Sequence, residues 1–186
     1  MNIIHKASVL LPSIILFFGL TANAQVPSDI QAGISKVTPE LLKFTTNKLI
    51  TSEVNKANTS PPVELSSMTN EKWKNLSILS PEAKLITKGE LSQFLVKNRP
   101  AFVSEIFVSA KNGTKVGFLT KPTSWSHLGT SKHDQPMQGK DWTGEVELDE
   151  STGINQIQVA FPVLDENRKP IGSIVFGLDV SKITAK

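Results

Sequence analysis

The sequence predicts an α+β domain with an antiparallel sheet of about five strands, a long N-terminal helix and shorter helices. Apolar residues recur at helical spacing in the first half of the chain. From residue 103 onward they alternate with polar residues, which is typical of half-buried strands. A long polar segment, residues 120–142, interrupts this second half. The order of helices, hairpin, long connection and three-strand meander fits helices that cover one face of a single sheet.

The first 24 residues are typical of a secretory signal peptide. A weakly basic start with Lys6 precedes an apolar stretch, and Ala22-Asn23-Ala24 fits a cleavage site with small residues. We expect cleavage after Ala24 and a periplasmic or secreted protein. A retained membrane anchor is the alternative, although the apolar stretch falls short of the ~20 residues that a span needs.

Composition excludes several classes of protein. The formal charge is +3 without a dense basic run, so no nucleic-acid partner is expected. The chain has no cysteine, so packing and not disulfides must stabilise it. No nucleophile elbow, phosphate loop or dinucleotide fingerprint is present, so neither an enzyme nor a cofactor is expected. The predicted division is a signal peptide (1–24), an N-terminal helical segment (25–66) and a sensor-like domain (67–183).

The helical segments come first. Residues after Ser28 and Asp29 carry some helix, and Thr38 followed by Pro39 predicts the start of a longer helix that ends near residue 57. Its apolar face comprises Leu41, Leu42, Phe44, Leu49, Ile50 and Val54. This face is expected to pack on the domain, with a homodimer contact as the alternative. A short helix within residues 66–78 turns Trp73 inward. Another helix begins at Ser80-Pro81 and ends before Pro100, weakened at Gly89.

The strands follow. Residues 103–110 and 114–119 predict a hairpin around Asn112-Gly113, since Asn-Gly between two apolar runs is a strong turn signal. Residues 143–148, 156–163 and 170–180 predict three further strands. The last of them is apolar on both faces, which favours a central position in the sheet.

The segment of residues 120–142 holds the candidate ligand-binding residues, because long loops in compact domains commonly form lids or binding sites. These residues are Trp125, His127, Lys132, His133, Asp134 and Trp142. The tryptophans would form the walls of a pocket. Lys132, Lys140 and a protonated His133 would hold a carboxylate, and Asp134 would orient His133 or accept from a ligand amine. Alternatively, both tryptophans pin the loop to the core and the lysines are solvated.

Over about residues 68–180 the chain resembles the extracytoplasmic Cache sensor domains, also called PDC domains, in their single-module form. The resemblance rests on Asn70-Glu71-Lys72-Trp73, Ser104-Glu105-Ile106-Phe107-Val108 with Gly113, Asp149-Glu150-Ser151-Thr152-Gly153, Phe161-Pro162-Val163, Lys169-Pro170-Ile171-Gly172 and Gly177-Leu178-Asp179-Val180. It implies a PAS-like fold and a small-molecule pocket between the sheet and the loop after the second strand. Family ligands include small carboxylates, amino acids, amines and urea.

The loop departs from the family. Similar chains often carry Ser-Asp-Tyr-Trp-Gln-Gly-Asp-Glu there, whereas residues 124–134 of this chain lack the acidic tail and carry a basic cluster. Only Ser124 and Trp125 align with that motif. The pocket chemistry of the family therefore does not transfer residue by residue.

The predicted function is periplasmic binding of a small anionic metabolite, such as a carboxylate, without catalysis. Closure of the loop would act on the N-terminal helix or on a partner, a membrane sensor kinase or a chemoreceptor. One alternative is a structural or protein-interaction module with a vestigial pocket. Another is a metal-binding periplasmic protein that uses His127, His133 and Asp134. A catalytic triad of Ser131, His133 and Asp134 is disfavoured, because adjacency in sequence is not triad geometry.

Overall fold

The computed structural model describes residues 26–149 and 153–185. The predicted signal peptide therefore lies outside the described residues, as does most of the turn before residue 153. The helical elements are α1 (Ser28–Thr45), α2 (Lys48–Thr59), the 3-10 turn η1 (Val63–Leu65), α3 (Asn70–Asn75), α4 (Pro81–Thr87), α5 (Glu90–Asn98), α6 (Ser131–Met137) and α7 (Val180–Ile183). None of these described helices is long and apolar enough to cross a bilayer.

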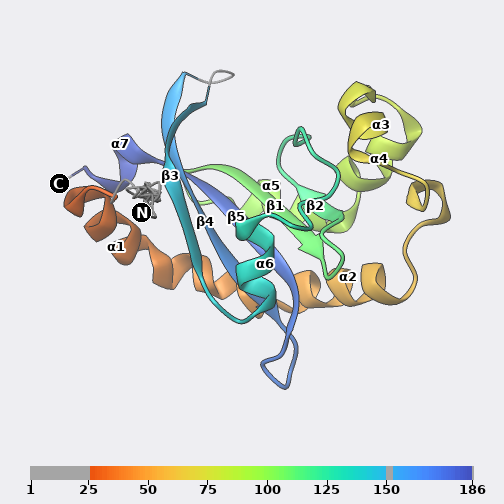
Figure 1. Cartoon of the computed structure of the whole chain (residues 1–186), viewed down its shortest axis with the longest axis horizontal. Coiled ribbons are helices and arrows are strands. Elements are labelled where there is room, and N and C mark those ends of the chain that lie inside the picture. Colours follow the sequence, from red (N-terminus) through yellow and green to blue (C-terminus); the bar gives the residue numbers. More distant parts are fainter. Residues whose placement is uncertain (1–25, 150–152, 186) are drawn as a thin grey trace, which may run out of the picture.

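One antiparallel sheet forms the centre of the domain (Figure 1). Its strands are β1 (Val103–Ala110), β2 (Lys115–Phe118), β3 (Trp142–Asp149), β4 (Ile154–Leu164) and β5 (Pro170–Asp179). They lie in the order β2-β1-β5-β4-β3. The α+β class, the five strands and the central position of the last strand are thereby confirmed.

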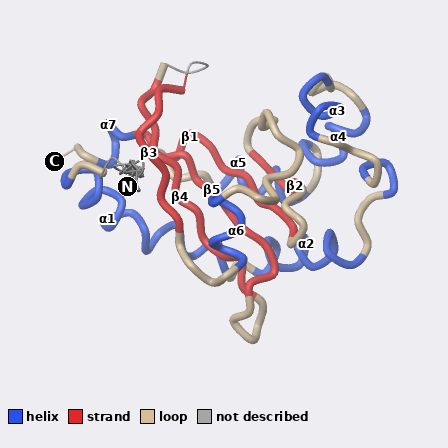
Figure 2. Tube along the Cα trace, in the orientation of Figure 1, coloured by secondary structure: helices blue, strands red, loops and turns tan. Residues whose placement is uncertain are grey.

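The two faces of the sheet bury different sets of side chains. Ile106, Val108 and Phe176 lie on the face that packs on α1, α2 and α5, in one large apolar cluster with Phe44 and Ile50. The opposite face is covered by α6 and by the loops around it (Figure 2). There Phe107, Ala160 and Val175 form a smaller apolar cluster together with Trp73 and Trp125. This second face also carries the buried polar side chains described below.

The predicted start of the N-terminal helix at Thr38 is wrong. Helix α1 begins ten residues earlier, at Ser28, and passes through Pro39. The Thr38 hydroxyl donates to the carbonyl of Ile34 at 2.8 Å, inside the helix, instead of capping a new one. The break falls at Asn47, whose side chain caps α2 by accepting from two backbone N–H groups of its first turn. Burial of the apolar face on the sheet outweighs the hydrogen bond lost at the proline.

The helix predicted from residue 81 to residue 98 is two helices. Gly89 does more than weaken its middle, since it is the N-cap residue of α5 and has extended backbone angles.

The segment of residues 120–142 also differs from a plain loop, because it contains α6. Pro136 inside α6 and the helix length of seven residues explain why no helical pattern was visible in the sequence.

The apolar face of the N-terminal helices is used within the chain. Leu41, Ile50 and Val54 are fully buried, whereas Leu42 remains 42% exposed. The predicted packing of this face on its own domain is thereby confirmed, and the alternative of a homodimer contact stays a prediction. The domain division at residue 66 stays a prediction, although α1 and α2 share the larger apolar cluster with the sheet.

A bulge between β1 and β2 decides which side chains reach the second face. Phe107 pairs with Phe118 and Val108 with Gly117, but Ser109 pairs with Lys115. One extra residue, Val116, therefore lies on the β2 side of the ladder. The bulge turns Lys115 to the same face as Ser109 and Phe107, which strict alternation along β2 would not do.

Candidate functional site

Eight polar residues gather between the second face of the sheet and the segment of residues 120–142. They are Glu105 and Ser109 from β1, Lys115 from β2, His127 from the loop, Lys132 and His133 from α6, Gln158 from β4 and Ser173 from β5. We call them the polar cluster. Five of them are buried, the exceptions being Glu105, Lys132 and Gln158, which are half-buried. No buried side-chain nitrogen or oxygen among the described residues lacks a hydrogen-bond partner.

Lys115 is the most deeply placed cation of the polar cluster. Its side chain is 3% exposed, and Nζ lies 3.2 Å from the Ser109 hydroxyl, 3.0 Å from His127 Nδ1 and 4.7 Å from the Phe107 ring centroid. Burial lowers the pKa of Lys115 to about 7, and the charge of Lys132 lowers it further while Glu105 opposes the shift. The amine therefore titrates near neutral pH.

His127 is held neutral by the same surroundings. Burial lowers its pKa to about 3, helped by the positive charges of Lys115 and Lys132. Its ring also packs on Phe107, with 4.8 Å between the ring centroids. A neutral His127 accepts at Nδ1 when its proton is on Nε2, so the hydrogen bond runs from Lys115 to His127.

A chain of polar contacts links α6 to the sheet. Lys132 Nζ donates to Gln158 Oε1 at 2.8 Å, and Gln158 Nε2 donates to Glu105 Oε2 at 2.8 Å. Burial raises the pKa of Glu105, although the hydrogen bond from Gln158 and the charge of Lys132 act in the opposite direction. The amide of Gln158 thus separates the cation from the only carboxylate of the polar cluster.

His133 fastens α6 to the centre of the sheet. Its Nδ1 lies 2.7 Å from the Ser173 hydroxyl, and its Nε2 lies 3.2 Å from the backbone carbonyl of Lys111. Burial lowers the pKa of His133, while the hydrogen bond to Lys111 and the charge of Asp134 partly offset that shift. His133 therefore joins the short helix to both β5 and the β1–β2 turn.

Three of the predicted site residues lie outside the polar cluster. Trp125 is buried against Trp73, with 5.1 Å between the ring centroids. This agrees with the alternative that Trp125 fixes the loop to the core. Asp134 accepts a hydrogen bond from the backbone N–H of Gly129 at 3.1 Å. Trp142 is half-buried at the start of β3 and packs against the smaller apolar cluster.

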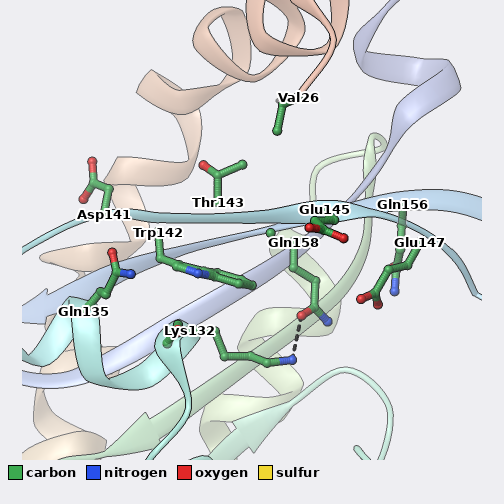
Figure 3. A pocket seen from close by; sticks show the side chains of 12 residues that line it. Val26, Lys132, Gln135, Asp141, Trp142, Thr143, Glu145, Glu147, Gln156 and Gln158 are labelled. Atoms are coloured by element: carbon green, nitrogen blue, oxygen red, sulfur yellow. Dashed lines mark hydrogen bonds between the residues drawn. The ribbon is translucent and has the colours of Figure 1, made fainter. Parts of the chain in front are cut away.

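A groove of about 660 Å³ opens beside the polar cluster, between α6 and strands β3 and β4. Lys132, Gln158 and Trp142 form part of its wall, and Glu145 and Glu147 of β3 form another part. Figure 3 shows the side chains of Lys132 and Gln158 directed toward each other within this wall. Asp141 lines the groove as well, so the groove combines one cation, an aromatic surface and three carboxylates.

Sequence reasoning missed five members of the polar cluster, namely Glu105, Ser109, Lys115, Gln158 and Ser173. A lysine on a short strand of mainly apolar residues was the available signal for Lys115, but the bulge that turns it inward leaves no mark in the sequence. Small serines inside apolar strands were the signal for Ser109 and Ser173.

The metal alternative has little support in this arrangement. Within residues 26–149 and 153–185, no three His, Cys, Asp or Glu side chains are placed to hold a metal ion. His127 and His133 each use Nδ1 in a hydrogen bond, to Lys115 and to Ser173 respectively.

No protein-family model matches the chain, and a search of curated proteins finds no match either. Solved structures that are similar to it include sensor domains. The DctB histidine kinase sensor domain of V. cholerae is 15% identical with a TM-score of 0.45, over 84% of this chain and 55% of that one. The DcuS sensor domain of E. coli is 15% identical with a TM-score of 0.36, over 74% of this chain and 96% of that one. The ligand-binding domain of the Campylobacter jejuni chemoreceptor Tlp3, in complex with L-valine, is 12% identical with a TM-score of 0.41, over 86% and 68%.

The chain spans 55% of the length of the first of these structures. The first two of these structures are sensor domains, and the third is the ligand-binding domain of a chemoreceptor.

Proposed function

We propose that this domain is a periplasmic sensor module that binds a small carboxylate ligand in the groove beside α6, without turnover. One observation carries the proposal. The ammonium of Lys132 is at the groove wall, and its hydrogen bond goes to the neutral amide of Gln158 and not to a carboxylate. A half-buried cation whose partner is neutral gains most from an anionic ligand, because charge-assisted hydrogen bonds are stronger than neutral ones.

The charges of the groove narrow the ligand class. Asp141, Glu145 and Glu147 line the same groove as Lys132, so a ligand with a carboxylate alone would meet repulsion from these three residues. A ligand that also carries an ammonium group would place its carboxylate on Lys132 and its ammonium on the β3 carboxylates. Trp142 offers a flat apolar surface for the part between the two groups.

Contacts between neighbouring elements could pass a conformational change from the groove to the N-terminal helix. Helix α6 contacts β3, β4 and β5, and β5 leads directly into α7, which packs on α1. Closure of α6 over a ligand would shift β5 and α7 and thereby α1. A membrane sensor kinase or chemoreceptor that reads this shift is the proposed partner.

A protein-interaction module remains the second candidate, because one segment exposes several large apolar side chains. Val63 is 82% exposed and Leu79 is 70% exposed, and Ile78 and Leu85 are each more than 40% exposed. Exposed apolar groups of this kind are common at protein contacts.

A thermal-shift screen tests the proposal. The purified protein would be melted with amino acids, simple mono- and dicarboxylates, amines, urea and divalent metals. A ligand at 100 times its dissociation constant adds about 2.7 kcal/mol of stability. A rise of the melting temperature with amino acids or other carboxylates supports the proposal. No rise with any carboxylate contradicts it, and a rise only with metals would favour the histidine site instead.

A further inference from the structure

Lys115 combines deep burial with partners that carry no negative charge. Nζ contacts the Ser109 hydroxyl, the ring nitrogen of His127 and the Phe107 ring. Among the described residues, the ion pairs within 4.0 Å join Lys56 to Glu53 and Lys182 to Asp179, and neither involves Lys115. A buried ammonium without a carboxylate partner is unfavourable, so this position favours the neutral amine.

The neutral amine is the reactive form of lysine. Two structural features hold Lys115 in this form, namely burial and the second ammonium, Lys132, which lies 6.0 Å from the centroid of the same Phe107 ring. The pKa of about 7 agrees with this geometry. A desolvated lysine beside another cation is a nucleophile at neutral pH.

The space around Nζ limits the electrophile to a very small molecule. Lys115 is 3% exposed and does not line the groove beside α6. It does contribute to the wall of a second groove of about 330 Å³, which is formed largely by α2, α4 and α5. Nζ is already in contact with Ser109, His127 and Phe107, so carbon dioxide, with three atoms and no charge, meets this size limit better than a carbonyl compound with side groups.

We propose that Lys115 is a carbamylation site that reacts reversibly with carbon dioxide. Nζ attacks the carbon, a bond forms between them, and one C=O electron pair moves onto oxygen. The amine loses one proton to solvent, so the product is the N-carboxylate of Lys115 and one H⁺. The proposal does not depend on which ligand fills the groove beside α6.

The carbamate would have donors and a cation around it, while the charge of Glu105 would oppose it. The Ser109 hydroxyl can donate to a carbamate oxygen, and the anion would lie near Lys132 and the two histidines. The polar cluster would then hold a second negative charge opposite Lys132. Carbamylation would tie α6 more tightly to the β1–β2 hairpin, because Lys132 belongs to α6 and Lys115 to β2.

The test uses the purified protein equilibrated with ¹³C-bicarbonate at pH 7.5. Carbamates would be detected by ¹³C NMR, then trapped by alkylation with triethyloxonium and located by peptide mass spectrometry. We expect a carbamate on the peptide that contains Lys115. The signal should be lost in Lys115→Arg and kept in Lys140→Arg, which changes an exposed lysine of the same chain.

Three outcomes would overturn the proposal. They are the absence of a trapped carbamate on the Lys115 peptide of the wild-type protein, an NMR signal that persists unchanged in Lys115→Arg, and trapping at exposed lysines alone. Peptide mapping of the wild type decides the question even if Lys115→Arg does not fold. Borohydride trapping with pyruvate is a separate check, since an imine at Lys115 without any carbamate would assign the amine to carbonyl chemistry instead. Failure of carbamylation leaves the thermal-shift result for the groove ligand unaffected.

Discussion

Nζ of Lys115 lies 3.0 Å from Nδ1 of His127, so two basic side chains share one hydrogen bond in the interior of the domain. With pKa values of about 7 and about 3, the pair carries a single positive charge at most near neutral pH. This arrangement lowers the free energy of unfolding, because no buried carboxylate pairs directly with Lys115 or His127. Sites that bind or react often retain such perturbed groups.

Replacement of Lys115 by methionine should stabilise the domain at pH 7. The variant removes a poorly paired buried amine and keeps a side chain of similar length, so we expect a gain of about 1 to 3 kcal/mol in the free energy of unfolding. The pKa of Lys115 is lower in the folded state than its ordinary value of 10.5. The unfolded state therefore binds more protons between pH 7 and 10.5, and wild-type stability should rise with pH in this window.

Urea denaturation at pH 7, 8 and 9 measures both effects. The rise with pH should be absent in Lys115→Met and retained in Lys140→Met, which changes an exposed lysine. A Lys115→Met variant that is less stable than the wild type at pH 7, with an unchanged slope, would show that the amine is well paired after all.

Acid should destabilise the domain partly through His127. Its pKa is lowered from 6.5 to about 3, so between these values the unfolded state binds a proton that the folded state does not. Stability from this group is present above pH 6.5 and is lost as the pH falls toward 3. Denaturation of the wild type and His127→Gln at pH 7, 5.5 and 4.5 should give a shallower loss in the variant. Parallel pH curves for the two proteins would mean that His127 is protonated in the folded state.

Lys132→Met should weaken binding of a carboxylate found in the thermal-shift screen. Hydrogen bonds to charged groups contribute about 1.5 to 3 kcal/mol, which corresponds to a loss of affinity of roughly 10- to 100-fold. The matched control is Lys140→Met, because Lys140 is exposed and does not line the groove. Isothermal titration calorimetry measures both variants. If wild type and Lys132→Met bind the ligand with equal affinity, the ligand does not bind in this groove.

The sheet could be predicted from the sequence because its signals are local. Alternation along β4 and the Asn112-Gly113 turn do not depend on distant residues, and Gly113 does adopt the positive φ of 81° that the tight turn requires. The start of α1 could not be predicted in the same way. There, tertiary packing of the helix overrides the start signal of Thr38 and Pro39, and α1 runs through both residues.

Only some residues of the candidate site could be predicted from the sequence. His127, Lys132 and His133 stood out because they lie in one polar segment, and the structure brings all three into the polar cluster. Their partners come from strands that are distant in sequence, and a bulge sets the direction of Lys115. Sheet register and bulges depend on the whole fold, so a single sequence does not show them.

The two tryptophans of the segment should respond differently to replacement by alanine. Trp125 is buried against Trp73, whose indole N–H donates to the carbonyl of Pro122 at 2.8 Å, so this pair fixes the start of the segment to the core. Trp125→Ala should cost about 3 to 5 kcal/mol in the free energy of unfolding. Trp142 is half-buried and lines the groove, so Trp142→Ala should cost less stability and should reduce ligand affinity more. Urea denaturation and calorimetry on both variants separate these effects. Equal losses of stability would show that Trp142 anchors the segment as firmly as Trp125. A loss of affinity in Trp125→Ala alone would show that Trp125 and not Trp142 forms the aromatic wall of the ligand site.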